Sequence, residues 1–267
     1  MAPADGRLDD DLDAAAERLI AEILRPRRRV RPRLAEPLHE AEDRQIDTPV
    51  GPVTAWRLGG GPAVLLVHGW EDDNALWGPL IGRLQANGRP VVVLDLPGHG
   101  FSPAEMGQPD AAGLAVSAVA KAFGPIEAVV GHSFGCVAIT WALNAGLVAE
   151  RAVLIASPIG KSRARALERL KDSDAAPEVA DRAVDLYAAR LAASAPFDIA
   201  AAAAHMTAKA LIIHSMDDEH CAPSNASLIA DHWPGAELMW VDGLGHRLVA
   251  QDADVTQRVA DFIEGFG

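Results

Sequence analysis

Short apolar runs, separated by segments with helical periodicity, are the feature that most constrains the fold of this chain. The runs are continuous rather than alternating and are rich in β-branched residues; they occupy residues 63–69, 91–96, 127–131, 152–156, 210–214 and 237–241. Continuous runs of this length are typical of strands buried on both faces, as in parallel sheets. Helix-period segments lie between them, around residues 75–86, 111–123, 134–146, 224–232 and 253–264. The alternation predicts an α/β fold with a doubly wound, mostly parallel sheet, preceded by a half-exposed strand over 53–58.

The alternation is interrupted once, by more than fifty residues between the runs 152–156 and 210–214. Two helical segments, 163–171 and 177–192, precede a crossover helix near 198–204. Because α/β sheets bind ligands beyond the carboxyl ends of their strands, an insertion there is well placed to act as a lid. We therefore predict a short helical lid over about residues 158–205. Its small side chains favour a modest apolar substrate group. Four alanines cannot all face solvent on one helix, and we expect them to pack beside Tyr187 and Leu191: Ala188, Ala189, Ala192 and Ala193.

The N-terminal region is predicted to be a helical extension followed by a connector. Apolar residues repeat with helical spacing over 8–24, aspartates occupy the first turns, and Pro26 ends the pattern. The sequence leaves open whether this stripe packs on the rest of the chain or on a partner subunit, which would make a homo-oligomer. The run "RPRRRVRPR" (25–33) favours a solvated linker over a localisation or anchoring signal. The predicted domains are 1–44, the helix and basic connector, and 45–267, the main domain with its lid.

Composition restricts the partners and the compartment of the chain. Its 267 residues carry a formal net charge of −13, which argues against a nucleic-acid or anionic-membrane binder because such proteins need a basic surface. No apolar run approaches the roughly 20 residues of a membrane span, and the acidic N-terminus lacks the order of a signal peptide. Cys136 and Cys221 fit neither a disulfide framework nor a zinc spacing. We predict a cytoplasmic protein without a membrane span.

The stretch "VVGHSFGCVAI" (129–139) places Ser133 where an apolar strand run ends and a helix begins. A reversal without a loop forces the middle residue into a strained conformation, and side chains at Gly131 or Gly135 would clash across it. The hydroxyl would then lie at the positive end of a helix, where developing negative charge is favoured. Taken alone, the stretch is compatible both with a reactive nucleophile and with an ordinary serine in a turn.

Later strands supply the partners that a reactive serine needs. Acyl transfer requires a base for the hydroxyl proton, an acid to orient that base, and donors for the oxyanion. The run 210–214 is followed by Asp217 and Asp218, and the run 237–241 is followed by His246. The chain order Ser, Asp, His is that of hydrolases built on a doubly wound sheet.

From about Ile46 to the C-terminus, the chain resembles the α/β-hydrolase superfamily of serine esterases. The matching pieces are "LLVHGW" (65–70), "LDLPGHGFS" (94–102), "GHSFG" (131–135), "IIHSMDD" (212–218) and "GLGHRLV" (243–249). The resemblance implies that Ser133 is the nucleophile, His246 the base and Asp218 the acid. It also implies that the oxyanion hole is formed by the backbone N–H groups of Trp70 and Phe134.

The sequence departs from the family pattern around the acid. The family usually has His-Gly-x-x-Asp, whereas this chain has His-Ser-Met-Asp-Asp. Counting from His214 selects Asp218, Asp217 is its immediate competitor, and counting back from Pro223 selects Glu219. A metal site formed by the residues around the acid (His214, Asp217, Asp218 and His220) is the weaker hypothesis, because His214 ends a buried strand. No dinucleotide or P-loop motif occurs, so we expect no cofactor and no metal.

Several other prominent residues are assigned structural roles. We expect His68 and His99 to hold loops through hydrogen bonds, and Asp95 to cap the loop after its strand. Four tryptophans are expected in the core: Trp77, Trp141, Trp233 and Trp240.

The predicted function is that of a serine hydrolase that cleaves carboxylic esters of small to medium apolar acyl groups through an acyl-enzyme intermediate. The substrate would be a small-molecule ester or thioester. The alternatives on the same triad are a thioesterase, a C–C bond hydrolase or an acyltransferase, and outside these a slow-turnover ligand-binding protein. The net charge disfavours coenzyme A thioesters, although the lid carries basic residues that suit phosphates: Arg163, Arg165, Arg169 and Lys171.

Overall fold

The computed structural model describes residues 5–27, 32–106, 110–159, 162–193 and 197–265. It divides the chain into two compact units. The larger unit comprises Arg27–Ile159 and Asp198–Gly267, and the smaller unit comprises Met1–Pro26 and Gly160–Phe197.

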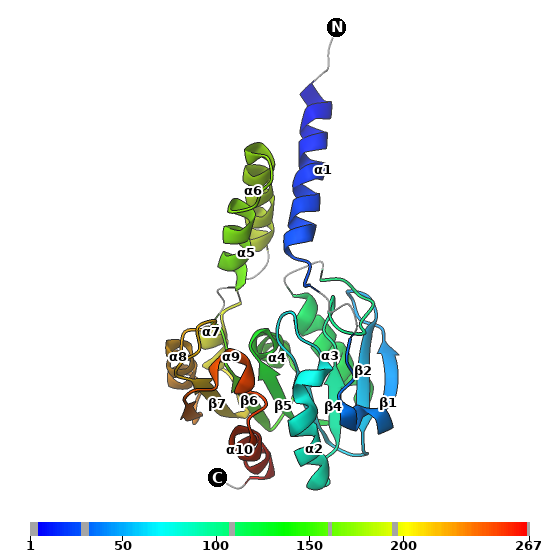
Figure 1. Cartoon of the computed structure of the whole chain (residues 1–267), viewed down its shortest axis with the longest axis vertical. Coiled ribbons are helices and arrows are strands. Elements are labelled where there is room, and N and C mark those ends of the chain that lie inside the picture. Colours follow the sequence, from blue (N-terminus) through cyan, green and yellow to red (C-terminus); the bar gives the residue numbers. More distant parts are fainter. Residues whose placement is uncertain (1–4, 28–31, 107–109, 160–161, 194–196, 266–267) are drawn as a thin grey trace. The chain divides into compact units, whose positions relative to one another are not determined.

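Within the described residues, the larger unit is built on one eight-stranded sheet (Figure 1) with the order β1-β2-β4-β3-β5-β6-β7-β8. The strands are β1 (Glu42–Ile46), β2 (Val53–Leu58), β3 (Ala63–Val67), β4 (Val91–Leu94), β5 (Ile126–His132), β6 (Arg151–Ile155), β7 (Lys209–Ser215) and β8 (Glu237–Val241). β2 pairs antiparallel with β1 and β4, and every later pair is parallel. The predicted doubly wound, mostly parallel sheet is confirmed.

The helices of the larger unit pack on the sheet in two groups (Figure 1). The elements are η1 (Glu36–Glu40), η2 (Asn74–Trp77), α2 (Gly78–Ala86), α3 (Ala111–Phe123), α4 (Phe134–Asn144), α7 (Ile199–Ala203), α8 (Ser224–His232), α9 (Gly245–Leu248) and α10 (Ala253–Glu264). α2 packs on α10, and their apolar faces share a buried cluster with alternate residues of the central strands, such as Ala128 and Val130. α3, α4, α7 and α8 pack in series.

The strand order creates a switch point in the middle of the sheet. The chain passes from β3 to β4 on one side, and the next strand, β5, then pairs with the other side of β3. The loops that follow β3 and β5 therefore leave the sheet in diverging directions, which opens a ligand site between them in sheets of this kind. Trp70 follows β3 and Ser133 follows β5, so the fold itself brings these two residues together.

The two edges of the sheet differ from the sequence prediction. β1 was not predicted: the N-terminal region was drawn to residue 44, within this strand, and four of its five residues are exposed. β8 was predicted to be buried on both faces, but it is an edge strand that pairs only with β7 among the described residues. Trp240 is consequently 39% exposed, so its assignment to the core was wrong. Trp77 and Trp233 are buried as predicted, and Trp141 is partly buried against Gly113.

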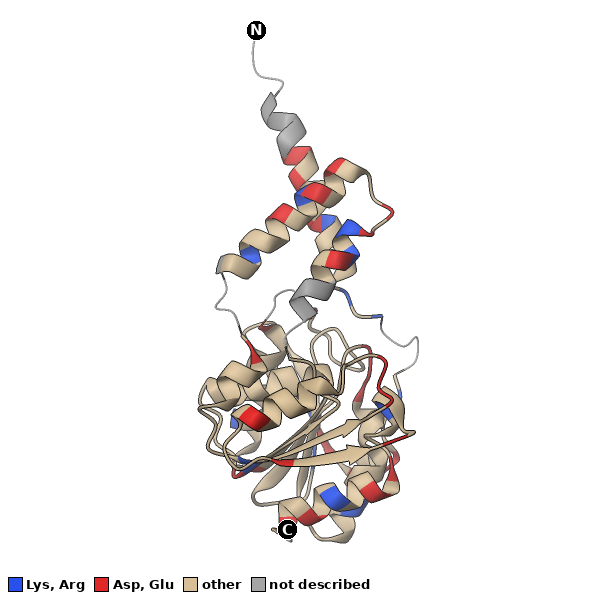
Figure 2. Cartoon of the chain, turned by 90° about the vertical axis from the view of Figure 1, so that its left-hand side faces the viewer, with Lys and Arg blue, Asp and Glu red and all other residues tan. Residues whose placement is uncertain are grey.

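The smaller unit consists of α1 (Asp5–Ile23), α5 (Ser162–Lys171) and α6 (Pro177–Ala193). Its buried residues form one apolar cluster: Ala16, Ile20, Ala166, Leu170, Ala183 and Tyr187. Around this cluster, charges of both signs are interspersed along the helices (Figure 2), and two arginines of α6 pair with acids of α1, Arg182 with Asp13 and Arg190 with Glu17. The apolar stripe of the N-terminal helix is thus covered by helices of the same chain.

These units group the chain differently from the predicted domains 1–44 and 45–267. Residues up to Pro26 belong with the insertion because the stripes of α1 and α6 cover each other, and the chain from Arg27 belongs to the larger unit. On α6, the spacing of Ala183, Tyr187 and Leu191 places them toward α1. The expectation that the lid alanines pack beside Tyr187 was wrong for the three that are described: Ala188, Ala189 and Ala192 are exposed.

Some predicted features fall outside the described residues or are not decided by the fold. Residues 28–31 of the basic run lie outside the described chain, as do the side chains of Arg163, Arg165 and Ala193. Across the described ranges, no helix is long and apolar enough to cross a membrane. The assignment of residues 158–205 as a lid stays a prediction.

Candidate active site

Ser133 lies in the one-residue turn between β5 and α4. Its backbone has φ 51° and ψ −118°, a conformation that non-glycine residues rarely adopt. The turn is held by a hydrogen bond in which the N–H of Ser133 donates to the carbonyl oxygen of Ile155 at 2.9 Å. The Ser133 side chain therefore lies at the carboxyl end of the sheet, on a strained backbone that the hydrogen bond to Ile155 holds in place.

Two glycines allow this turn. A Cβ atom at Gly131 would lie 2.8 Å from the backbone nitrogen of Cys136, and one at Gly135 would lie 2.1 Å from the carbonyl oxygen of Val67. Both distances are far below van der Waals contact, and the obstructing atoms belong to the backbone. The prediction that any side chain at these two positions would clash is confirmed.

His246 and Asp218 meet Ser133 at the same end of the sheet. The Nε2 atom of His246 lies 2.9 Å from Oγ of Ser133, and its Nδ1 atom lies 2.8 Å from Oδ2 of Asp218. Asp218 follows β7, and His246 lies on α9, a four-residue helix after β8. The three side chains form one hydrogen-bonded series, in which a base can take the serine proton while a carboxylate faces its other nitrogen.

The carboxylate of Asp218 is held by donors on both of its oxygens. Oδ1 accepts the N–H groups of His220 at 2.8 Å and Cys221 at 2.9 Å, while Nε2 of the buried His214 lies 3.2 Å from Oδ2. Burial alone would raise the pKa of the Asp218 carboxyl. The hydrogen bonds from His214, His246 and the backbone outweigh burial and hold this pKa well below its usual range. Asp218 is therefore a carboxylate across the neutral range.

The two competing acids lie elsewhere. Asp217 is exposed, and its Oδ1 accepts hydrogen bonds from the hydroxyl of Ser215 and, at 3.1 Å, from the N–H of Gly245. These bonds lower the pKa of Asp217 and fix the turn that precedes α9. Glu219 is exposed. Asp218 therefore faces the His246 ring, whereas Asp217 accepts a hydrogen bond from the backbone of Gly245, the residue before His246.

At the switch point, the backbone N–H of Trp70 lies on the loop after β3 and that of Phe134 lies at the first residue of α4. Among the described residues, neither N–H has a hydrogen-bond acceptor. The loops approach closely, since a Cβ at Gly69 would lie 3.1 Å from Cβ of Ser133. The rings of Trp70 and Phe134 meet edge to face with their centroids 5.5 Å apart. Two unused donors next to a serine hydroxyl are what an oxyanion hole requires.

Residues 64–262 match the alpha/beta hydrolase family, which is three quarters of the chain. The chain belongs to this family. It is 40% identical over 102 residues to a pimeloyl-[acyl-carrier protein] methyl ester esterase of Vibrio parahaemolyticus, a match that spans 38% of each protein. A protein of the same description from Xanthomonas campestris is 40% identical over 78 residues, 29% of this chain and 30% of that protein. The chain therefore matches these relatives over well under half of their length.

Solved structures of esterases share the fold of this α/β hydrolase. An esterase from Pyrococcus furiosus superposes with a TM-score of 0.69 at 20% identity, covering 91% of this chain and 99% of the esterase. An esterase from Thermogutta terrifontis has a TM-score of 0.65 at 19% identity, covering 85% of this chain and 99% of that chain. At such identities the likeness shows the fold. The family match over residues 64–262 confirms the predicted resemblance to the α/β-hydrolase superfamily.

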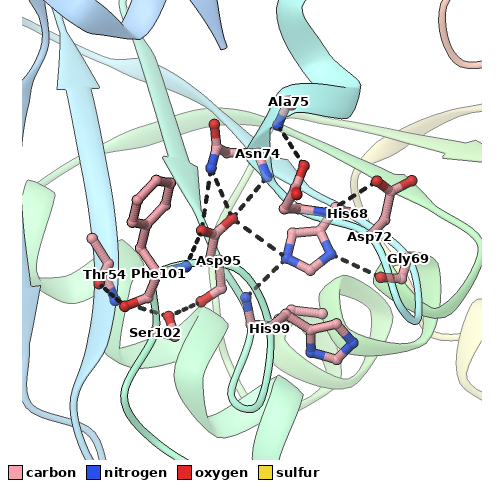
Figure 3. Close-up of polar contacts among 12 residues, drawn as sticks. Thr54, His68, Gly69, Asp72, Asn74, Ala75, Asp95, His99, Phe101 and Ser102 are labelled. Carbon is pink, nitrogen blue, oxygen red and sulfur yellow. Dashed lines mark hydrogen bonds and ion pairs between the residues drawn. The ribbon is translucent and has the colours of Figure 1, made fainter. Parts of the chain in front are cut away.

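In this member of the alpha/beta hydrolase family, the loop that carries Trp70 is held by buried polar side chains (Figure 3). Nδ1–H of His68 donates to the carbonyl oxygen of Gly69 at 2.8 Å, and Nε2 of His68 accepts the N–H of Leu96 at 3.0 Å. Because the Gly69 carbonyl and the Trp70 N–H belong to one planar peptide group, the bond from His68 also fixes the direction of that N–H. His99 acts one residue further on, where its Nε2 accepts the N–H of Glu71 at 3.0 Å.

Asp95 ties the next part of the loop, as Figure 3 shows. Its carboxylate accepts the N–H of Asn74 at 2.7 Å and the N–H of Phe101 at 2.8 Å. Burial raises the pKa of Asp95, against the opposing effect of the nearby His68 and of these hydrogen bonds. The predictions that His68, His99 and Asp95 hold loops are confirmed by these contacts.

Sequence reasoning missed three contacts of the His246 segment. The ring of His132 lies 5.0 Å from that of His246 between centroids, and the ring of His220 stacks on it at 5.1 Å. Arg247, the next residue, pairs with the buried Asp72 at 2.8 Å. His132 stands inside the "GHSFG" motif and was visible there, but nothing local indicated which partner it faces. In the part of the chain that the structure describes, no group of three or more His, Cys, Asp or Glu side chains is arranged to hold a metal ion.

Proposed function

We propose that this protein is a serine esterase that hydrolyses carboxylic esters of small to medium apolar acyl groups. The observation that carries the proposal is the hydrogen-bonded series from Oγ of Ser133 through His246 to Asp218. The relatives named methyl ester esterases support an ester as the substrate bond. The apolar acyl group is proposed from the alanine-rich insertion of the sequence.

In the proposed first step, Oγ of Ser133 attacks the ester carbonyl carbon while Nε2 of His246 takes its proton. The resulting imidazolium faces Asp218, whose depressed pKa keeps it ionised and able to stabilise that charge. The tetrahedral oxyanion accepts hydrogen bonds from the N–H groups of Trp70 and Phe134. Because both loops are fixed before substrate arrives, these donors need no reorganisation in the transition state.

Collapse of the tetrahedral intermediate breaks the bond to the alcohol, which leaves with the proton from His246. This step leaves the acyl group on Ser133. Water then attacks the acyl-enzyme, with His246 taking its proton and returning it to Oγ. The acid is released and Ser133 is regenerated.

The test combines covalent labelling with turnover. Wild-type protein should react with a fluorophosphonate and hydrolyse nitrophenyl esters with a preference among acyl chain lengths from acetate to decanoate. Ser133→Ala should lose both, with turnover falling by up to about 10⁶-fold. Ser224→Ala is the matched control, because Ser224 is an exposed serine at the start of α8. Burst kinetics retained in Ser133→Ala would exclude Ser133 as the nucleophile, and a wild type that releases no product would exclude the esterase.

A further inference from the structure

A second buried histidine contacts the base of the proposed esterase. His132 ends β5 and directly precedes Ser133, and only 3% of it is exposed. Its ring is tilted by 48° against the ring of His246. The contact joins residues 114 positions apart in the chain. It is therefore a feature of the tertiary structure and not of the motif around the serine.

A hydrogen bond from His132 reaches the main chain of His246. Nε2 of His132 lies 2.7 Å from the carbonyl oxygen of His246. A carbonyl oxygen can only accept, so Nε2 carries the proton and donates it. With Nε2 protonated, Nδ1 is the bare nitrogen of a neutral ring, and it is buried without a hydrogen-bond partner among the described residues.

The surroundings keep this ring neutral. Burial, together with the positive charge that His246 acquires, lowers the pKa of His132 to about 3. A neutral ring holds one tautomer, and therefore one donor, whether or not His246 is protonated. The hydrogen bond to the His246 carbonyl thus persists through each change of charge on the base.

Besides the ion pair between Arg247 and Asp72, two further hydrogen bonds hold the turn that leads into α9. The N–H of Gly245 donates to Asp217 at 3.1 Å, and the N–H of Leu244 donates to Ser215 at 3.3 Å. These two bonds anchor the turn before α9 to the end of β7. Among the described residues, the hydrogen bond from His132 links the backbone of His246 to β5, the strand that ends directly before Ser133. Ser133 and the backbone of His246 are thus connected through the peptide bond between His132 and Ser133 and through the imidazole ring of His132.

We propose that His132 is a positioning residue that sets the distance and angle between Ser133 and His246. The inference rests on the proposed function, since it concerns the same base and nucleophile. The orphaned Nδ1 supports it, because leaving a buried acceptor unpaired costs stability that an apolar side chain of similar size would not cost. The polar interaction that this ring makes within the described residues is the one from Nε2 to the His246 carbonyl oxygen.

The kinetic test compares three substitutions. In His132→Leu the donor is absent, and we expect kcat on nitrophenyl acetate to fall by about 10²-fold, the loss that a misplacement near 1 Å can cause, with KM nearly unchanged. His132→Gln places an amide N–H near the former Nε2 and should recover most of this loss. His205→Leu is the matched control, because His205 is an exposed histidine after α7 and should leave kcat unchanged. Thermal melting of each variant shows whether it is folded.

Nuclear magnetic resonance of histidine-labelled protein tests the positioning without turnover. The Nδ1–H of His246 should give a downfield proton resonance in wild type, because it donates to Asp218. We expect this resonance to broaden or shift in His132→Leu and to return in His132→Gln. An unchanged resonance in folded His132→Leu would overturn the proposal even if no ester were hydrolysed. A kcat for His132→Leu equal to wild type, or equal losses in the Leu and Gln variants, would overturn it in an active enzyme.

Discussion

Because His132 is buried as a neutral ring, we predict that the free energy of unfolding of the larger unit depends on pH. Its pKa is lowered to about 3 in the folded protein, mainly by burial, whereas an unfolded chain should titrate this histidine at about 6.5. Between these values the unfolded state binds a proton that the folded state excludes. Stability therefore falls as the pH is lowered through 6.5, and it stops falling on this account below about 3.

The size of the effect follows from the two pKa values. Each pH unit within this window is worth about 1.4 kcal/mol at 25 °C. Between pH 7 and pH 5 the titration of His132 alone should remove about 2 kcal/mol from the free energy of unfolding. His132→Gln cannot bind this proton, and its loss over the same interval should be smaller by that amount.

Urea denaturation followed by tryptophan fluorescence measures this difference in the correct part of the chain. The sequence has six tryptophans, all between positions 56 and 240 and none within Met1–Pro26 or Gly160–Phe197. Fluorescence therefore reports on the larger unit and not on the smaller one. The other titrating groups are common to wild type and His132→Gln, so they cancel when the change from pH 7 to pH 5 is compared between the two.

Equal pH dependence in wild type and His132→Gln would refute the reasoning. It would mean that His132 accepts a proton in the folded state at pH 5, and then its ring would not hold a single tautomer. A steeper loss in the variant would refute it as well. The comparison requires equal m-values at both pH values, since a changed m-value would indicate a changed unfolded or folded state.

Three further outcomes follow from the contacts described. Asp218→Asn should lower kcat/KM for esters by up to about 10⁴-fold because an amide can reverse the hydrogen bond to the base, whereas Asp217→Asn should cost much less; near-wild-type rates for Asp218→Asn would transfer the acid role. Gly135→Ala should lower the melting temperature sharply because its Cβ would meet backbone atoms. The control Gly82→Ala, on α2 with open space around it, should be neutral or stabilising by up to about 1 kcal/mol, and equal melting temperatures of the two variants would contradict the clash. Ile20→Ala should reduce amide-exchange protection in α5 and α6 as well as in α1, and a loss confined to α1 would show that the smaller unit is not one cooperative unit.

The parts of the fold that the sequence predicts correctly are those that local pattern decides. The runs that became β3 to β7 are apolar because the strands are covered on both faces, so their composition reports their burial directly. The clash at Gly131 is equally local, since it involves Gly135 and Cys136 of the same turn, whereas the clash at Gly135 involves Val67 of the neighbouring strand.

What the sequence does not predict depends on which elements become neighbours. β8 has the composition of a buried strand, yet its place at the edge of the sheet exposes Trp240. α1 shows an apolar stripe, but the helices that cover it lie more than 130 residues later in the chain. The choice between Asp217 and Asp218 is similar, because both follow β7 and only the position of α9 decides which carboxylate meets His246.

The sequence motif around Ser133 does not predict the contact that His132 makes. Gly131 is required within the turn and Gly135 by the close approach of Val67, so the glycine pattern around Ser133 is visible in five letters. The histidine between them is under a different constraint, imposed by a carbonyl oxygen on α9 that no local pattern can reveal. Since it is buried and hydrogen-bonded to the backbone of His246, we expect a substitution there to change the geometry of Ser133 and His246 without removing either. Differences in rate between hydrolases with the same triad can therefore originate at the position next to the nucleophile.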